Sequence, residues 1–175
     1  MATPGGQSAA QLCYKTGMVA ADTLLRRVRR TDFTAVMGLL AAADAPIPPP
    51  DRRSLHRFRH LAADLGADCY LAFSAGVLAG LVHVTYARHL AAPPVARIER
   101  LVVAAGLRQR GVGRQLLDLA RARATRRGCG TLELALPADA SDAAAFLAHA
   151  GFTAAGSVVA LPLPAGTPPG VDTTR

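Results

Sequence analysis

The sequence predicts an α+β fold class, in which helices flank one mixed but mainly antiparallel sheet. Short apolar segments and amphipathic helical segments follow one another in the order β-αα-β-β-β-α-β-α-β. Two apolar segments, 70–73 and 77–86, are separated only by the triplet SAG, which favours a hairpin. The strand–helix–strand unit over 97–136 adds a parallel pair, because such a crossover returns to the same sheet. We expect six to seven strands and about four helices.

Two helices follow a first strand at Thr23–Arg29. Thr31 or Asp32 can cap the first helix, and the prolines of DAPIPPP break it. Gly66 is expected to stop the second helix. Each helix has one apolar stripe, formed by Phe33, Val36, Leu39 and Leu40 in the first and by Leu55, Phe58, Leu61 and Leu65 in the second.

The hairpin is followed by a strand, RIERLVV, at residues 97–103. A helix over 112–127 comes next and ends at Gly128. The segment TLELAL forms a strand with its three leucines on one face. A short helix, SDAAAFLAHAG, and a last strand over 152–163 complete the order. The inward face of the 112–127 helix is expected to carry Leu116, Leu117, Ala120 and Ala124.

Length and composition bound the class of protein. The 175 residues are 51% hydrophobic and 18% charged, which suits one globular domain. No apolar run reaches the ~18 residues of a membrane span, and the first residues lack the pattern of a secretory signal. We therefore expect a cytoplasmic protein without a membrane partner. We expect residues 1–20 to be a disordered extension, 21–163 the domain and 164–175 a flexible tail.

The chain is strongly basic. Its formal net charge is +8 and its pI is about 10.6, and Lys15 is the only lysine. The arginines gather at 26–30, 52–59, 108–114 and 121–127. Such a chain could bind nucleic acid or a polyanionic small molecule. Because aromatic residues make up only 5%, no base-stacking surface is indicated. We interpret most arginines as solvated helix faces, and a nucleic-acid partner is not favoured.

The stretch GLRQRGVGRQLL, residues 106–117, joins a strand to a helix through closely spaced glycines. The start of a helix after such a turn can bind an anion. A P-loop is excluded, because Val112 and Gly113 stand where its Lys-Ser/Thr pair must be. A dinucleotide fingerprint is disfavoured, because Leu116 occupies the position of its third glycine.

The pattern Arg108-x-x-Gly111-x-Gly113, after ERLVV and before a helix, resembles the acetyl-CoA loop of the GNAT superfamily of N-acetyltransferases. The later segments GCGTLELAL and DAAAFLAHAGF also resemble that family, the second ending in its typical Gly-Phe pair. The resemblance covers residues 23–163. It implies a GNAT-like sheet whose central parallel pair is splayed to admit CoA. It also implies direct transfer of an acetyl group from acetyl-CoA, without a metal, to a primary amine of a small molecule or peptide.

The resemblance also assigns roles to residues. The N–H groups of the loop would bind the pyrophosphate, and the pantetheine arm would pair with the backbone of Val102 and Val103. An N–H near Val103 would stabilise the oxyanion. The expected cosubstrate-binding residues are Leu101, Val102, Val103, Arg108, Gln109, Arg110, Gly111, Val112, Gly113, Arg114, Asp142 and Phe146.

Glu99 is the candidate general base, because the amine must lose a proton before it attacks. In RIERLVV, strict alternation would put it on the face of Leu101 and Val103, where an apolar setting would make the carboxylate a better base. The alternative is a structural salt bridge from Glu99 to a neighbouring arginine.

One position departs from the family's pattern. Leu147 stands where a tyrosine usually donates a proton to the leaving thiolate. A thiol with a pKa near ~8.5 can leave as a thiolate, so activity need not be lost. His149 and Tyr86 are alternative donors. A degenerate CoA-binding sensor or structural module is the alternative function.

The remaining histidines and the cysteines give weaker indications. His83 is interpreted either as a packing residue or as part of the acceptor pocket. His56 and His60 have a spacing that can hold a metal, but no third ligand is evident. The cysteines fit neither a disulfide framework nor a zinc site. Dimers are common among proteins similar to this one, so a homodimer is an open alternative.

Overall fold

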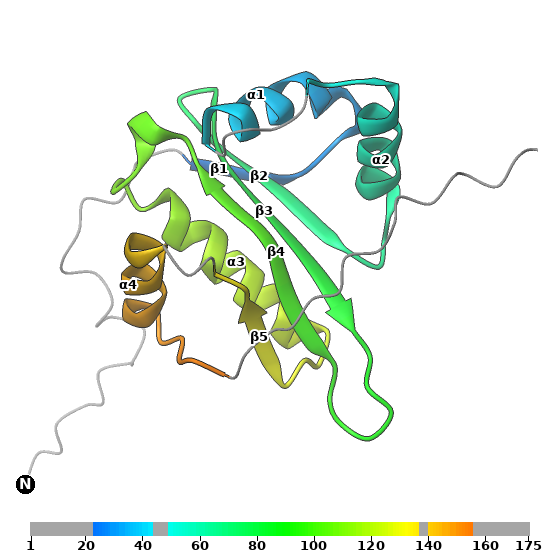
Figure 1. Cartoon of the computed structure of the whole chain (residues 1–175), viewed down its shortest axis with the longest axis vertical. Coiled ribbons are helices and arrows are strands. Elements are labelled where there is room, and N and C mark those ends of the chain that lie inside the picture. Colours follow the sequence, from blue (N-terminus) through cyan, green and yellow to red (C-terminus); the bar gives the residue numbers. More distant parts are fainter. Residues whose placement is uncertain (1–22, 44–48, 137–139, 156–175) are drawn as a thin grey trace, which may run out of the picture. The chain divides into compact units, whose positions relative to one another are not determined.

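The computed structural model describes residues 23–43, 49–136 and 140–155. The chain divides into two compact units, 1–134 and 135–175. The first unit contains a five-stranded sheet in the order β1-β2-β3-β4-β5 (Figure 1). Its strands are β1 Thr23–Arg27, β2 Asp68–Ser74, β3 Val77–Ala87, β4 Val95–Val103 and β5 Thr131–Leu134.

The mixed sheet confirms the predicted class. Strands β1 to β4 pair antiparallel, and β5 runs parallel to β4. The described residues hold five strands, so the expected six to seven are not confirmed. Residues 152–155 are not in a strand, and the rest of the expected last strand lies outside the described residues. The proposed extension over 1–20 and the tail over 164–175 lie outside them too.

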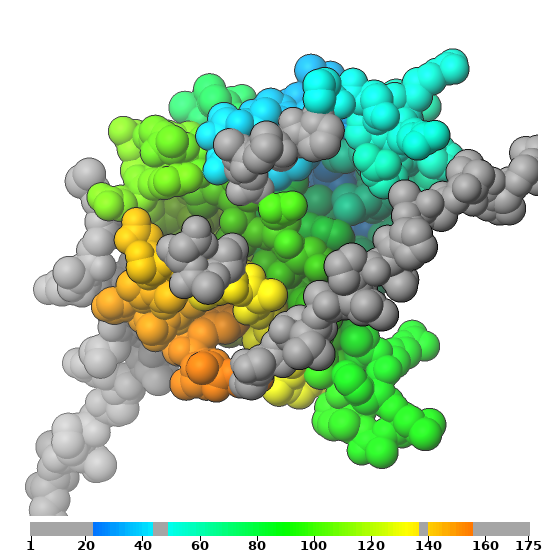
Figure 2. All heavy atoms as spheres, viewed as in Figure 1, coloured from blue at the N-terminus to red at the C-terminus, as the bar shows by residue number. Residues whose placement is uncertain are grey.

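The β2–β3 hairpin forms where the sequence predicts it. Ala75 and Gly76 both have positive φ, 48° and 79°, which is the backbone of a tight hairpin turn. Strand β2 begins at Asp68, two residues before the predicted start. At the other end of β3, the connection 88–94 projects from the surface (Figure 2), and Leu90 within it is fully exposed.

Helices α1, Phe33–Ala43, and α2, Arg52–Ala63, start with different devices. Asp51 caps α2 by accepting the N–H of Ser54 at 2.7 Å, while the Ser54 hydroxyl accepts the N–H of Asp51 at 2.8 Å. Asp32 ends a short 3-10 turn before α1 and accepts the N–H of Arg29 at 2.7 Å. α2 ends before the predicted stop, since Gly66 follows it by three residues.

The helices cover both faces of the sheet. Leu71 and Leu81 are register partners in β2 and β3 and belong to the core beneath α1 and α2. Gly80, next to Leu81, faces the other way, toward Val112 and Leu116 of helix α3, Val112–Arg126. The core beneath α1 and α2 is formed by Val28, Val36, Leu39, Phe58, Cys69, Leu71, Leu81 and Val102.

Gly80 is required by this packing. A Cβ at Gly80 would lie 2.7 Å from the carbonyl oxygen of Val102 and 3.0 Å from Cδ1 of Leu116. Glycine inside a strand is typical of such a close approach. The first turn of α3 can therefore lie directly against the sheet.

Two glycines end helices, and the first of them, Gly128, was predicted to do so. Gly128 has φ 70° after α3, and the N–H of Cys129 donates to the carbonyl of Ala124. In the second unit, Gly151 has φ 86° after α4, Ser141–His149, and the N–H of Phe152 donates to the carbonyl of Leu147. Both ends have the hydrogen bonds of a Schellman motif.

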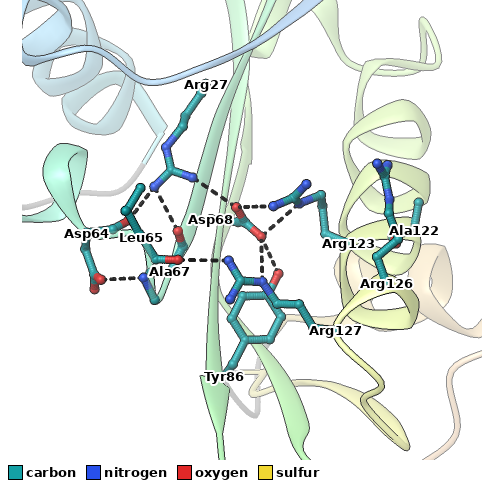
Figure 3. Close-up of polar contacts among 11 residues, drawn as sticks. Arg27, Asp64, Leu65, Ala67, Asp68, Tyr86, Ala122, Arg123, Arg126 and Arg127 are labelled. Atoms are coloured by element: carbon teal, nitrogen blue, oxygen red, sulfur yellow. Dashed lines mark hydrogen bonds and ion pairs between the residues drawn. The ribbon is translucent and has the colours of Figure 1, made fainter.

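A buried charge cluster joins four elements of the first unit (Figure 3). The carboxylate of Asp68 is 1% exposed and binds the guanidinium groups of Arg27 at 3.1 Å, Arg123 at 2.9 Å and Arg127 at 3.3 Å. The hydroxyl of Tyr86 donates to it at 2.6 Å. Arg123 and Arg127 were expected on a solvated helix face, and this expectation is wrong because both turn toward the buried carboxylate.

The structure also bears on the predicted lack of a membrane span. Across residues 23–43, 49–136 and 140–155, no helix is both long enough and apolar enough to cross a bilayer.

Candidate active site

A β-bulge interrupts β4 where it lies against β3. His83 pairs with Arg100 and Val84 pairs with Ile98, so Glu99 lies between these pairs without a partner of its own on β3. A bulge of this kind adds one residue to a strand and changes which residues share a face. Side chains alternate between the two faces of the sheet on either side of Glu99, but the alternation after Glu99 is offset by one residue from the alternation before it.

The bulge turns Glu99 toward the face covered by α1 and α2. Oγ1 of Thr85 donates to Oε1 of Glu99 at 2.6 Å. Thr85 shares its strand face with His83, and with Leu81 of the core beneath α1 and α2. The predicted face, with Leu101 and Val103, is therefore wrong, because strict alternation does not hold across a bulge.

Glu99 itself is exposed, and the predicted apolar setting around it is absent. The hydroxyl of Thr85 is the hydrogen-bond partner of its Oε1 atom. Within residues 23–43, 49–136 and 140–155, no salt bridge joins Glu99 to an arginine. Its role as general base stays a prediction.

The edge of β4 beyond the bulge is open toward β5. The parallel pairing runs only from Val95 opposite Thr131 to Ile98 opposite Leu134, where β5 ends. Within the described residues, no strand is paired with that edge of β4 over 99–103. The described pairing between β4 and β5 therefore stops before the part of β4 that the resemblance assigns to the pantetheine arm, and the splaying of the pair stays a prediction.

Backbone groups of Leu101 and Val103 face this open edge. The N–H of Ala104 donates to the carbonyl of Ala79 at 2.9 Å, so main-chain groups at alternate positions of β4 point away from β3. Nε of Arg108 lies 3.5 Å from the carbonyl oxygen of Val103, on the outer side. The carbonyl of Val102 faces β3, close to Gly80, so its predicted contact with the cosubstrate stays a prediction without support from this carbonyl.

The loop between β4 and α3 presents free N–H groups. The N–H of Gln115 donates to the carbonyl of Gly111 at 3.0 Å, which closes the first turn of α3. The N–H groups of Val112, Gly113 and Arg114 precede that bond and have no acceptor within the helix. No side chain caps this end, and Gly111 has φ 82°. An anion fits such an end, where the helix dipole adds to the N–H groups.

The side chains of this loop differ in how they are held. Val112 is buried against the sheet and anchors the loop. Arg108, Gln109 and Arg110 are exposed, and Gln109 has φ 59°. Arg114 pairs with Asp118, one turn further along α3, at 3.2 Å. The cationic side chains lie on the segment that presents the free N–H groups, and their predicted contact with the pyrophosphate stays a prediction.

Asp142 and Phe146 lie in the second unit, on α4. Their predicted contacts with the cosubstrate stay predictions. The alternative donor His149 is also on α4, where its Nδ1 lies 2.7 Å from the carbonyl oxygen of Ala145. The Gly151-Phe152 pair beyond Leu147 closes the helix, which gives these two residues a structural role.

The position of Tyr86 does not favour it as the proton donor. It pairs with Ala96 in β4, whereas the open edge begins beyond Ile98 and the loop starts after Val103. Its hydroxyl already donates to Asp68, and burial and that bond raise the pKa of Tyr86 far above its ordinary value. The hydroxyl is therefore engaged in the charge cluster, which does not favour it as the proton donor.

His83 lies near the bulge, and the sequence alone did not decide between its two possible roles. It is half-buried on the face of Thr85 and Glu99. Burial lowers the pKa of its imidazole, although the charges of Glu99 and Asp64 act in the opposite direction. Its role, as a packing residue or as part of an acceptor pocket, stays a prediction.

Metal binding has no support in the described parts of the chain, which hold no group of three or more ligand side chains. His56 and His60 stack on α2 with ring centroids 4.3 Å apart, but both are exposed and stand among arginines. Cys69 is buried, and burial raises the pKa of its thiol to about 12, so it is an inert core residue as predicted.

Solved structures share this fold. A transcriptional regulator from Bacillus halodurans C-125 has a TM-score of 0.74 and 22% identity, with 81% of this chain and 100% of that chain covered. A glucosamine-6-phosphate N-acetyltransferase from Arabidopsis thaliana has a TM-score of 0.70 and 14% identity, with 82% and 99% covered. AAC(6')-Iy, in complex with the bisubstrate analogue CoA-S-monomethyl-acetylneamine, has a TM-score of 0.71 and 19% identity, with 83% and 100% covered.

Sequence comparison identifies the family. No curated protein matches this sequence closely. The family model described as the acetyltransferase (GNAT) family matches residues 33–152, which include the bulged strand, the loop and α3. The structural likenesses agree with that match in fold. The chain therefore belongs to the GNAT family of acetyltransferases.

Proposed function

We propose that this protein is an N-acetyltransferase that transfers the acetyl group of acetyl-CoA to a primary amine by direct attack. The observation that carries the proposal is the open edge of β4 beside the free N–H groups of α3. An acyl donor with an anionic head and a long amide-bearing arm is complementary to that pair of features. The family match supports acetyl-CoA as the donor.

The residues that would hold acetyl-CoA fit it chemically. The N–H groups of Val112, Gly113 and Arg114 suit a pyrophosphate, and exposed Arg108 and Arg110 add positive charge. The outward main-chain groups of Leu101 and Val103 suit the amides of the pantetheine arm, which would pair as an added strand. Bound in this way, acetyl-CoA supplies an activated acyl carbon at the open edge.

Residues of this chain would then orient the two reactants and activate the thioester. The outward N–H of Leu101, between the bulge and Val103, would donate to the thioester carbonyl oxygen as negative charge develops on it. The carboxylate of Glu99 faces the side from which an amine would approach, and it attracts an ammonium group. Leu147 offers no proton, so the leaving thiolate would depart unassisted or take a proton released by the amine.

The acceptor is proposed only as a primary amine of a small molecule or peptide. Two similar structures are titled as an aminoglycoside acetyltransferase and a ribosomal-protein-alanine N-acetyltransferase, so neighbours of one fold act on different amines. The net charge of +8 disfavours a polycationic acceptor.

The proposal is tested by incubating the protein with acetyl-CoA and a panel of amines while free thiol is measured. The panel should include an aminoglycoside, an amino-sugar phosphate, a polyamine and peptides with free N-termini or lysines. We expect thiol release that depends on one class of amine and an acetylated product one acetyl group heavier. Absence of turnover with every amine, together with tight acetyl-CoA binding, would contradict the enzyme proposal.

A CoA-binding sensor is the second candidate. Two observations favour it: Leu147 lacks a proton-donating group, and a similar structure is titled as a transcriptional regulator. The sensor function predicts acetyl-CoA binding by calorimetry without acetyl transfer to any amine of the panel.

A further inference from the structure

We propose that His83 removes the proton from the acceptor's ammonium group, while Glu99 holds that ammonium in place. This inference rests on the proposed acetyl transfer and assigns the two polar groups of the bulge different tasks. The sequence alone pointed to Glu99 as the base.

The bulge brings the two side chains to the same place. His83 pairs with Arg100, directly after the bulged Glu99, and the Glu99 side chain turns to the face of His83 and Thr85. Without the bulge, Glu99 would point to the opposite face, with Leu101. A carboxylate and an imidazole on one face can contact the same ammonium group.

The side chains of Glu99 and His83 differ in the hydrogen bonds that they already make. Oε1 of Glu99 already accepts the proton of the Thr85 hydroxyl at 2.6 Å. Across the described residues, no hydrogen bond engages either ring nitrogen of His83. The ring is half-buried, so part of it remains accessible from the face. Neither ring nitrogen therefore has to give up a hydrogen bond within the described residues before it accepts a proton.

Burial and the neighbouring ionisable groups together keep the imidazole of His83 uncharged at neutral pH. Burial lowers the pKa of its imidazole below its ordinary value, against the opposing effect of Glu99 and Asp64. Arg100 is its register partner on β4, and Cys69 is its partner on β2, with a thiol that stays protonated. Helix α1 has no ionisable side chain, and the ionisable side chains of α2 are exposed. At neutral pH the imidazole is unprotonated and can accept a proton.

The bulge is also at the right distance from the loop. From Val103, beside the loop, β4 runs back four residues to Glu99, or ~13 Å at ~3.3 Å per residue. An extended pantetheine arm along the open edge covers a distance of this order. The thioester would therefore lie near the bulge, with His83 and Glu99 on the side of the sheet that α1 and α2 cover.

The step balances as follows. His83 takes one proton from the ammonium and becomes imidazolium, which leaves a neutral amine with a free electron pair. That pair forms the C–N bond to the acetyl carbon, and the C–S bond then breaks with its electrons on sulfur. The nitrogen releases its second proton to the thiolate, and His83 returns its own proton to water. The products are the amide, CoA thiol and one proton.

The first measurement does not depend on turnover. We expect an NMR titration to place the pKa of His83 below the ordinary value of ~6.5, and Glu99→Gln to lower it further, since a negative charge is removed. The control is His89→Gln, a change of an exposed histidine on the β3–β4 connection, which should leave the titration of His83 unchanged. A His83 titration that is unaffected by Glu99→Gln would overturn the inference, because the two groups would not share a site.

The second measurement is the pH profile of kcat/KM with an accepted amine. Wild-type activity should fall as the pH drops through the pKa of His83. His83→Gln should lower kcat by about a hundredfold, within the range of general base catalysis, and abolish that acid limb. Glu99→Gln should mainly raise KM for the amine and keep the limb. His83→Gln must retain wild-type acetyl-CoA affinity, which shows that it folds.

The opposite result, in which Glu99→Gln abolishes the acid limb and His83→Gln keeps it, would overturn the inference and make Glu99 the base. A failure of the proposed function is recognisable separately. In that case no amine releases thiol with the wild-type protein, whatever the titration of His83 shows.

Discussion

Nε of Arg123, on α3, lies 2.9 Å from Oδ2 of the buried Asp68, at the start of β2. The pair joins a helix to the sheet across 55 residues of sequence. Arg27 and Arg127 approach the same carboxylate, so one negative charge holds three cations. This cluster lies at the end of the sheet away from the loop that precedes α3, and it orients the helix whose first turn forms the proposed anion site.

Asp68→Asn should lower the free energy of unfolding by about 3 kcal/mol, because it leaves partly buried arginines without their counter-charge. Urea denaturation measures this loss. The matched control is Asp118→Asn, which removes an exposed partner of Arg114 and should change stability by less than about 0.5 kcal/mol. Equal effects of the two substitutions would mean that the cluster does not stabilise the fold.

The same carboxylate makes stability depend on pH. Burial alone would raise the pKa of Asp68, but hydrogen bonds from Arg123 and Tyr86 outweigh it, and the pKa is lowered overall. The stabilisation is therefore complete above the unfolded pKa of ~3.9 and is lost as the pH falls through the lower folded pKa. Unfolding free energies measured from pH 7 to pH 3 should fall more steeply for the wild type than for Asp68→Asn. Identical slopes would contradict this assignment.

The sequence predicted elements better than it predicted contacts between them. Hydrophobic periodicity and glycine positions gave the hairpin, the parallel pair and the ends of α3 and α4, because these are local signals. The bulge at Glu99 could not be predicted, since it exists only in the register between β3 and β4. The Asp68 cluster depends on residues far apart in the chain, although an aspartate at the start of an apolar run was a signal of a buried pair. Gly80, inside a strand pattern, was a similar signal of close packing.

Tyr86→Phe should leave kcat unchanged within about twofold, because the hydroxyl is committed to Asp68 and its register partner Ala96 lies in the part of β4 that β5 covers. It should lower the free energy of unfolding by about 1 kcal/mol, since the buried carboxylate loses one donor. Steady-state kinetics and urea denaturation of the same variant separate the two effects. A large fall in kcat with normal acetyl-CoA affinity would restore Tyr86 as a candidate proton donor.

Gly80→Ala should destabilise the protein by about 1–3 kcal/mol, because its Cβ would lie 2.7 Å from a backbone oxygen and force β4 or α3 to move. Acetyl-CoA affinity should fall as well, since the first turn of α3 is anchored here. Gly38→Ala on α1 is the control: nothing lies within 4 Å of its Cβ position, and alanine favours a helix by up to ~1 kcal/mol. A Gly80→Ala variant as stable as Gly38→Ala would mean that this contact is not tight in solution.

Gly111→Ala and Gly128→Ala form a matched pair at the two ends of α3. Both glycines have positive φ, 82° and 70°, and open space around the Cβ position, so alanine costs a similar ~1–2 kcal/mol of backbone strain at each. Only Gly111 adjoins the free N–H groups proposed to bind the pyrophosphate. We therefore expect the two variants to lose similar stability, whereas only Gly111→Ala should weaken acetyl-CoA binding, by about tenfold or more, or ~1.4 kcal/mol. Isothermal titration calorimetry with acetyl-CoA measures the difference. If both variants bind acetyl-CoA as the wild type does, the cosubstrate is not held at this end of α3, and the anion site must be sought elsewhere.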